Sequence, residues 1–538
     1  MSRCSITPWR NCWWRRSTVV SPRSERLHRI NDIKKLVNSM QVTVKAGAIE
    51  QEKTGAAVVL IFDGEKPGSL QNRLDKALGG SLQRLIKQGG FRPTHGSVAL
   101  IYPESRIAAE RVLLMGLGKR SGFSLERLRQ AAGKAAPYLR STGSADIVFL
   151  LDGYGLAPEE AAQAVIEGSM LGLYRFLVYK TGPDPQQEKD VRKITILSEK
   201  ADALGPLRKG ARAGEVIAEA TTMVRDLVNA PARDMTPAIM AAKARALSQT
   251  LGLKLQVLER TQMERLGMGA LLGVSSGSVE PPKFIIVEYR GGAKKPNIVL
   301  VGKAITFDSG GISLKPAQNM ETMKEDMSGG AAVLGTIQAA AMLKLPLNII
   351  GLLPATENMP SGSAYKPGDV LRTMSGKTIE ITNTDAEGRL ILSDALAYGC
   401  RYKPALMVDV ATLTGACSVA LGHEAIGMLG TSDLYKEKMR KAGEESGERV
   451  WELPLWEEYQ DYIKSDIADM KNTGGRAGGV IAAAALLSRF VQNYPWVHLD
   501  IAATSWTDKG RPYAPKGATG VGVRILTQFL RDYAASTK

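Results

Sequence analysis

Seven charged residues with the chemistry of metal ligands and their counter-charges gather in three short segments of the 538-residue chain: Lys303, Asp308, Lys315, Asp326, Asp385, Glu387 and Arg389. If the four carboxylates converge, they repel one another, and each must bind a proton or a cation. Divalent metal ions would relieve that repulsion. The pattern therefore predicts either a carboxylate-bridged site for two metal ions or a structural network of salt bridges.

Oxygen atoms must dominate any metal site built from these segments. The chain has four His and four Cys, and none of them lies between residues 301 and 399. Carboxylates suit Mg²⁺ and Mn²⁺, and they also bind Zn²⁺. We therefore expect carboxylate ligands, with lysine amines as the available nitrogen ligands.

Predicted strands end where these charged residues begin. The apolar run 298–301 leads to Lys303 and Asp308, and the run 379–381 leads to the segment that contains Asp385. In open α/β sheets, ligands bind at the carboxyl ends of the strands. Asp326 precedes a glycine pair and a helical pattern at 331–343, so we expect it near a helix N-terminus, where an anion is favoured.

The spacing Asp385-x-Glu387-x-Arg389 carries further information. In an extended or turning backbone, residues two apart project to the same side. These three side chains can therefore address one cavity. The following helical pattern covers residues 390–398.

Apolar runs alternate with helical patterns from Met40 onwards, which predicts α/β layers with mainly parallel sheets. We expect strands at 56–62, 97–102, 112–115, 147–151, 284–289, 298–301, 347–353, 379–381, 406–410 and 497–501. We expect helices at 74–86, 125–139, 159–177, 207–228, 237–251, 331–343 and 390–398.

The long helical pattern 207–228, which ends at Asn229-Ala-Pro231, reads as a connector between two domains. The predicted fold class is α/β with two domains. A smaller N-terminal α/β domain (40–204) is joined by a long helix (205–231) to a larger C-terminal α/β catalytic domain (232–538) with a mixed central sheet. Residues 1–39 form a basic leader outside this fold.

The net charge of +16 raises nucleic acid or an anionic surface as a partner. Residues 1–39 carry nine basic and two acidic residues, so the rest of the chain has a net charge of only +9. The Arg- and Ser-rich leader resembles an organelle transit peptide; the alternative, which we favour, is that translation starts at Met40.

Composition also bears on the compartment. Four Cys, two of them in the leader, are too few for a disulfide scaffold, which indicates a reducing compartment. No run of residues is apolar enough for a membrane-spanning helix. We expect a cytoplasmic protein without membrane association, or an organelle protein if the leader is a transit peptide.

Residues 383–390 (Asn-Thr-Asp-Ala-Glu-Gly-Arg-Leu) resemble the signature octapeptide of the leucyl aminopeptidase family, which includes cytosol aminopeptidase and bacterial aminopeptidase A. Residues 301–316 resemble the metal-loop motif of the same family, with Ala304 where the family usually has Gly. The resemblance covers residues 225–535. Within this range it is also found at 225–231, 411–416, 475–484 and 498–502.

The resemblance implies a metal-dependent aminopeptidase that hydrolyses N-terminal Leu and other apolar residues from peptides, using a hydroxide shared by two divalent ions (Mn²⁺ or Zn²⁺). Asp308 and Glu387 would bridge the ions. Asp385 would complete one metal site, and Lys303 with Asp326 would complete the other. A lysine ligand is a neutral amine, so the dications would have to lower the pKa of Lys303 strongly.

The family likeness also implies residues around the metals and an assembly. Lys315 would polarise the scissile carbonyl, and the guanidinium of Arg389 would hold a bicarbonate ion that shuttles the proton. Backbone groups at Ala386, Gly388 and Leu413 would help to bind that bicarbonate. The pocket for the first substrate side chain would be lined by Met323, Asn383, Thr412, Leu413 and Gly415. A homohexamer is expected.

Other interpretations are weaker. Gly376-Lys-Thr378 resembles the end of a phosphate-binding loop, but Leu371 stands where that loop needs a glycine. His498, between two apolar residues of a predicted strand, is interpreted as a core histidine.

Some bacterial relatives in this family also bind DNA, so the alternative is a DNA-binding regulatory or architectural activity in addition to the peptidase.

Overall fold

The computed structural model describes residues 40–65, 68–182 and 190–536. The predictions for the basic leader therefore lie outside the described residues. Within the described part, no helix combines the length and apolarity needed to cross a membrane.

The N-terminal part contains a six-stranded sheet in the order β1-β6-β5-β2-β4-β3. Neighbouring strands run parallel except β3, which is antiparallel to β4. The strand β2 is buried along its whole length, as a central strand covered on both faces must be. The strands are β1 (Gln41–Ala46), β2 (Ala56–Phe62), β3 (Val98–Ile101), β4 (Val112–Gly118), β5 (Asp146–Leu150) and β6 (Lys193–Ser198).

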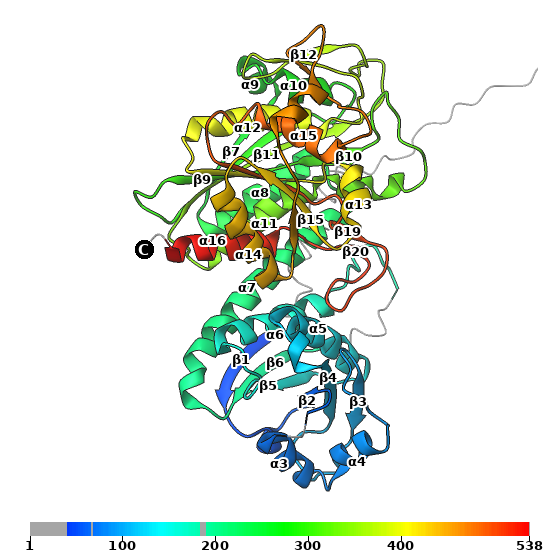
Figure 1. Ribbon diagram of the computed structural model, residues 1–538, viewed down its shortest axis with the longest axis vertical. Helices are drawn as coiled ribbons and strands as arrows, with labels where there is room; N and C mark the ends of the chain where they lie inside the picture. Colours follow the sequence, from blue (N-terminus) through cyan, green and yellow to red (C-terminus); the bar gives the residue numbers. More distant parts are fainter. Residues whose placement is uncertain (1–39, 66–67, 183–189, 537–538) are drawn as a thin grey trace, which may run out of the picture. The chain divides into compact units, whose positions relative to one another are not determined.

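Helices cover both faces of this sheet (Figure 1). The helices α3 (Ser69–Ala77) and α4 (Ser81–Lys87) lie on one face, and α5 (Leu125–Ser141) and α6 (Pro158–Leu173) lie on the other. Each face buries its own apolar cluster.

The prediction of one helix over 74–86 is wrong, because the pattern is interrupted by Gly79 and Gly80. Both glycines adopt left-handed backbone conformations, with φ of +64° and +79°. The carboxylate of Asp75 then accepts hydrogen bonds from Leu82 N (2.9 Å) and Gln83 N (3.1 Å) at the start of α4. Apolar spacing continues across the break, but the backbone does not.

The helix α7 (Leu204–Asn229) runs along the predicted connector and ends just before Pro231. It packs against α6 and against α11 (Ser328–Met342) of the C-terminal part. The guanidinium of its buried Arg225 donates to Leu171 O, Tyr513 O and Thr519 O, each at 2.9 Å. The architecture of two α/β domains is confirmed, while the boundaries between them stay a prediction.

The C-terminal part contains a mixed nine-stranded sheet in the order β16-β15-β18-β14-β9-β11-β8-β7, with β10 paired to β11. The four central strands β18, β14, β9 and β11 are parallel, whereas β15, β8 and β7 add antiparallel pairs. The strands are β7 (Lys254–Leu258), β8 (Lys283–Arg290), β9 (Asn297–Gly302), β10 (Ala304–Asp308), β11 (Asn348–Asn358), β14 (Leu406–Ala411), β15 (Ile426–Gly430), β16 (Val450–Glu452) and β18 (Trp496–Asp500).

Helices cover both faces of this sheet as well (Figure 1), and each face buries its own apolar cluster. One face is covered by α8 (Pro237–Leu251), α11, α14 (Asp433–Ser446) and α16 (Val523–Ser536). The other face is covered by α10 (Gly269–Ser275), α12 (Gly388–Gly399) and α15 (Gly479–Ser488). The short elements are α9 (Arg260–Arg265), β12 (Val370–Arg372), β13 (Thr378–Glu380), α13 (Gly415–Leu421), β17 (Met470–Lys471), β19 (Trp506–Thr507) and β20 (Gly517–Ala518).

Replacing Arg225 with Ala should lower the free energy of unfolding by about 3 kcal/mol or more, because three buried carbonyls lose their donor and a cavity remains. Urea unfolding followed by circular dichroism measures the change. The control is Arg245→Ala, which removes an exposed arginine of α8 and should change stability by less than about 0.5 kcal/mol. Equal unfolding midpoints for the two variants would contradict the prediction.

Candidate metal centre

Lys303 lies between β9 and β10, and its backbone contacts the first turn of α11. Its backbone N donates to Val410 O (3.0 Å), and its carbonyl accepts from Gly330 N (2.7 Å). A Cβ on Gly329 would lie 2.0 Å from Val410 O, so only glycine allows this close approach. The sequence pattern placed Gly329 and Gly330 before the helix, but α11 begins at Ser328 and includes both in its first turn. The methyl group of Ala304 packs against Gly330.

The side chain of Lys303 is buried and joins three segments. Its Nζ lies 2.8 Å from Asp326 Oδ1 and 2.7 Å from Glu387 Oε1. It also donates to Thr412 O at 3.0 Å. Asp326 belongs to the 3-10 helix η5 (Met320–Met327), which ends where α11 begins, so its expected place near a helix N-terminus is confirmed.

A second charged group surrounds Lys315. Its Nζ lies 2.8 Å from Asp308 Oδ2 and 2.5 Å from Asp385 Oδ1. Asp308, Asp385 and Glu387 each offer a carboxylate oxygen, and these three oxygens lie within 4.8 Å of one another. The four carboxylates and two lysines singled out in the sequence thus form one continuous cluster.

Sequence reasoning missed Asn358, the last residue of β11. It is fully buried, and its Nδ2 donates to Asp308 Oδ1 (2.8 Å) and to Thr384 O (3.0 Å). The same nitrogen lies 3.4 Å from Glu387 Oε2. Asn358 therefore orients two carboxylates at once. No sequence signal marked it, because the strand predicted at 347–353 ends five residues before Asn358.

Asn472 is a second residue that the sequence did not single out. Its Oδ1 accepts from Thr382 N (2.8 Å), and its Nδ2 donates to Asn383 O (2.6 Å). Its backbone carbonyl accepts from Arg389 Nη1 (2.7 Å). This buried asparagine connects the turn that precedes Asp385 to the guanidinium that follows Glu387. No local sequence pattern marks it, because it lies about 90 residues away along the chain.

The carboxylates repel one another strongly. Burial raises the pKa of Asp326 well above its ordinary value, and burial together with the charge of Glu387 raises the pKa of Asp308 to about 6. Burial also acts to raise the pKa of Glu387, but the positive charges of Lys303 and Lys315 outweigh it and the pKa is lowered. Without further cations, the cluster must keep protons on some of its carboxylates.

Lys303 is an ammonium in the metal-free protein. Burial lowers its pKa, but the charges of Asp326, Glu387 and Asp308 outweigh burial, so the net pKa is raised. The lowered pKa expected from the resemblance applies to a metal-bound site, in which dications face the amine.

The donor set fits divalent metal ions. Four carboxylates on rigid elements offer hard oxygen ligands, and Asp326 Oδ2 is buried without a hydrogen-bond partner among the described residues. The net charge of four acids and two lysines is negative, so added dications would be attracted and not repelled.

Arg389 lies in the first turn of the twelve-residue helix α12. Its Nη1 has a partner in Asn472 O, while its buried Nε has none within the described residues. Burial lowers the pKa of Arg389 to about 10. A guanidinium N–H that has no acceptor in the described part of the chain, in the first turn of a helix, favours an anion. Of the backbone groups expected to assist, Leu413 N already donates to Asp500 Oδ1 at 3.2 Å.

The residues expected to line the substrate pocket lie on two of the segments that carry the carboxylates and on the segment that follows β14. Met323 belongs to η5, Asn383 precedes Asp385, and the others follow β14. Thr412 is buried, whereas Met323, Asn383 and Leu413 are half-buried and Gly415 is exposed. Partly open side chains beside the charged cluster suit contact with a ligand from solvent.

His498 lies in β18 and is fully buried, in agreement with a core histidine. Its Nδ1 lies 2.6 Å from Asp409 Oδ1, and Trp496 Nε1 donates to the second oxygen of that carboxylate at 2.7 Å. Its Nε2 has no partner in the described part of the chain.

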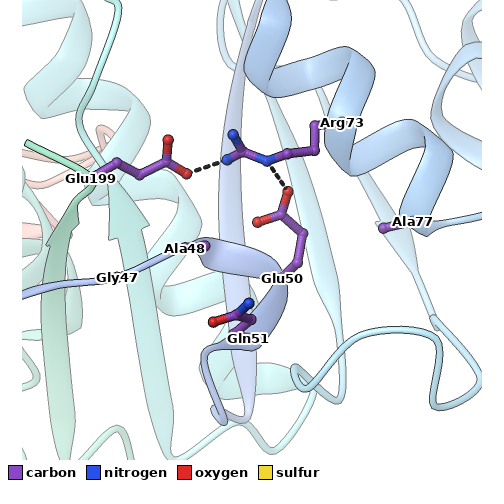
Figure 2. Close-up of a pocket in the computed structure, with 7 residues that line it drawn as sticks. All are labelled: Gly47, Ala48, Glu50, Gln51, Arg73, Ala77 and Glu199. Atoms are coloured by element: carbon purple, nitrogen blue, oxygen red, sulfur yellow. Dashed lines mark hydrogen bonds and ion pairs between the residues drawn. The ribbon is translucent and has the colours of Figure 1, made fainter.

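A cavity of about 630 Å³ lies in the N-terminal domain and not at the charged cluster (Figure 2). Arg73 projects into it and bonds to Glu50 Oε1 (2.5 Å) and to the carboxylate of Glu199. Two carboxylates already share this guanidinium. The cavity contains none of the residues assigned to chemistry, so the charged cluster remains the candidate site.

Family comparison identifies both parts of the chain. Residues 222–527 match the cytosol aminopeptidase family, catalytic domain, and residues 58–183 match the N-terminal domain of the same family. The chain is 49% identical over 497 residues to the "Probable cytosol aminopeptidase" of Geobacter sp. (strain M21), covering 91% of this chain and 100% of that protein. The protein of the same name from Roseiflexus castenholzii is 47% identical and covers 92% of this chain and 99% of its own length.

Solved structures agree with these matches. A mutant of tomato leucine aminopeptidase superposes with a TM-score of 0.82 at 30% identity, covering 92% of this chain and 97% of that chain. The bottromycin maturation enzyme BotP in complex with Mn superposes with a TM-score of 0.79 at 35% identity, covering 89% of this chain and 100% of that chain. The fold and the family resemblance predicted from the motifs are confirmed.

Replacing Asn358 with Ala should weaken Mn²⁺ binding by about tenfold or more, because Asp308 and Glu387 lose the amide that orients them. Calorimetric titration of the metal-free protein measures the affinity. The matched control is Asn297→Ala at the opposite end of β9, where the amide bonds to Tyr402 O. Unchanged Mn²⁺ affinity in Asn358→Ala would show that this amide does not support the site.

Proposed function

The chain belongs to the cytosol aminopeptidase family and is a metal-dependent aminopeptidase, and from this premise we propose that it removes N-terminal Leu and other apolar residues from peptides with two divalent ions. The observation that carries the proposal is the cluster of Asp308, Asp385 and Glu387, whose oxygens lie within 4.8 Å of one another. Lys303 and Asp326 extend that cluster on one side.

The assignment of ligands follows the family resemblance. Asp308 and Glu387 would hold both ions, and this is supported by their oxygens, which lie within 4.8 Å of each other and of an oxygen of Asp385. Asp385 would complete one metal site. Lys303 and Asp326, which are 2.8 Å apart, would complete the other. The Mn²⁺ complex of BotP supports Mn²⁺ as an occupant, with Zn²⁺ as the alternative.

Bound divalent ions would polarise the peptide carbonyl and lower the pKa of a water molecule. The protein supplies a fixed positive charge at Lys315. Burial lowers the pKa of Lys315, but the charges of Asp308, Glu387 and Asp385 outweigh it, so this partly exposed side chain stays protonated. Its ammonium would stabilise the negative charge that develops on the carbonyl oxygen.

Arg389 is the proposed holder of bicarbonate. Its buried Nε lacks an acceptor within the described residues, and Gly388 is the first residue of α12, where the helix dipole favours an anion. Bicarbonate bound there would supply general acid–base chemistry, and the role of Arg389 would be to hold it by charge and hydrogen bonding. Ala386 and Leu413 are the further backbone positions proposed for this anion; in this structure their N–H groups donate to Asn383 O (3.4 Å) and Asp500 Oδ1 (3.2 Å).

The proposed pocket for the first substrate side chain consists of Met323, Asn383, Thr412, Leu413 and Gly415. Met323 and Leu413 give it an apolar surface, which suits Leu. The comparisons match peptidases and lend no support to an additional DNA-binding activity. Assembly into a homohexamer and a cytoplasmic location remain predictions from the family resemblance.

Replacing Lys315 with Ala should reduce kcat by about 10²-fold or more on Leu-peptides, because a charge that stabilises the transition state is lost. Removing the metal with a chelator should abolish activity, and adding Mn²⁺ should restore it. Release of free Leu measures both effects. The control is Lys366→Ala, an exposed lysine 3.8 Å from Asp369, which should leave the rate unchanged. A metal-loaded protein that releases no N-terminal residue would refute the proposed function.

Replacing Arg389 with Ala should reduce kcat by about 10²-fold, because the proton shuttle loses its anchor. The unaltered enzyme should slow when bicarbonate is removed and recover when it is returned, whereas the variant should respond to neither. Steady-state assays in degassed buffer test this. Arg401→Ala, which changes an exposed arginine just beyond α12, should behave like the unaltered enzyme. A variant with full bicarbonate dependence would rule out Arg389 as the anchor.

A further inference from the structure

Asp500 is a buried carboxylate to which the peptidase chemistry above gives no role. It is the last residue of β18, and in the sheet it pairs with Ala411 of β14 and Gly427 of β15. The strand β14 ends at Ala411, and the chain then turns through residues 412–414. The carboxylate of Asp500 therefore lies beside the turn that follows β14.

The carboxylate of Asp500 accepts three hydrogen bonds, and two of them hold this turn. Its Oδ1 accepts from Leu413 N (3.2 Å) and from Ala502 N (3.1 Å). Its Oδ2 accepts from Thr414 Oγ1 (2.8 Å). The same hydroxyl accepts from Cys417 N at 3.2 Å and so caps α13. A buried carboxylate is tolerated only with such partners, and here two of the three are consecutive residues of one turn.

The adjacent residue of the turn contacts the metal cluster. Thr412 Oγ1 donates to Asp326 Oδ1 at 2.7 Å, and Thr412 O accepts from Lys303 Nζ at 3.0 Å. No contact between Asp500 and the cluster is needed to connect them. Asp500 holds Leu413 and Thr414, which directly follow Thr412. A shift of the turn would therefore move Thr412 relative to both of its partners, Asp326 and Lys303.

We propose that Asp500 is a positioning residue of the metal centre, since its carboxylate fixes the 412–414 turn and that turn orients Asp326 and Lys303. The effect on catalysis rests on the proposed function. The effect on metal binding does not, because it depends only on the contacts of Thr412.

The chemistry of the side chain distinguishes two substitutions. Asp500→Ala removes both carboxylate oxygens. Leu413 N–H and the Thr414 hydroxyl then lose the acceptor that Asp500 provides. Asp500→Asn keeps an oxygen for Leu413 and Ala502 and places an NH₂ group beside Thr414, whose hydroxyl can accept instead of donate. If the position of the turn matters and the charge of residue 500 does not, Asp500→Asn should keep most of the Mn²⁺ affinity that Asp500→Ala loses.

Calorimetric titration of the metal-free, full-length protein with Mn²⁺ tests the proposal. The binding step that Asp326→Ala removes identifies the ion on that side of the cluster. Asp500→Ala should weaken this step by about tenfold or more and change the other step by less than about threefold. Asp500→Asn should recover most of the affinity, and kcat/KM on a Leu-peptide should follow the same order.

The matched control is Asp394→Ala. Asp394 is also a buried carboxylate that accepts from two backbone N–H groups, Leu271 N (2.9 Å) and Met374 N (2.7 Å), but those groups do not contact the cluster. This variant should lose thermal stability, as Asp500→Ala should, and yet keep both Mn²⁺ affinities. Loss of stability without loss of Mn²⁺ affinity in Asp500→Ala would overturn the proposal.

If Asp500→Ala does not fold, Thr414→Val decides the question. This variant removes one of the three hydrogen bonds and should weaken the same Mn²⁺ step by about threefold. An unchanged Mn²⁺ affinity there would overturn the proposal. The titration needs no substrate, so an unaltered protein that binds Mn²⁺ without cleaving peptides would refute the proposed function and leave this test intact.

Discussion

Repulsion among four close carboxylates is the constraint on which the site depends. Asp308, Asp326, Asp385 and Glu387 are mostly buried, and burial and mutual repulsion raise the pKa of the three aspartates. Lys303 and Lys315 supply two compensating charges, each within 2.8 Å of two carboxylates. The remaining negative charge is what makes the cluster a place for divalent cations.

The parallel centre of the nine-stranded sheet makes that arrangement possible. The strands β9 and β14 end at the same level of the sheet, and β10 continues beyond β9 along the end of β11. The glycine pair of α11 lets the helix approach the backbone at Lys303. Neutral amides and hydroxyls then hold the charged groups in place: Asn358 between two carboxylates, Asn472 behind Arg389, and Thr412 beside Asp326. The charged residues do the chemistry, while these uncharged ones set their positions.

Sequence patterns predicted the elements well where hydrophobic spacing and chain breaks agree. The helix α8 begins and ends at the predicted residues, with Pro237 at its start and Gly252 after its end. The predicted helix over 74–86 failed because apolar spacing does not report a left-handed glycine pair. The charged residues of the site could be found because a family motif keeps them close together in the chain. Asn358, Asn472 and Asp500 could not, because their partners are distant in sequence.

The sequence by itself determined the family, the α/β class and the ligand chemistry, since residue type and local spacing suffice for these. The tertiary structure decided which groups touch. It placed Lys303 between Asp326 and Glu387 and Lys315 between Asp308 and Asp385. It also left the Nε of Arg389 without a partner among the described residues. The physical reason is that pKa values and hydrogen bonds depend on distances of a few ångströms between residues separated by tens to hundreds of positions, and only the packed sheet and its helices set those distances.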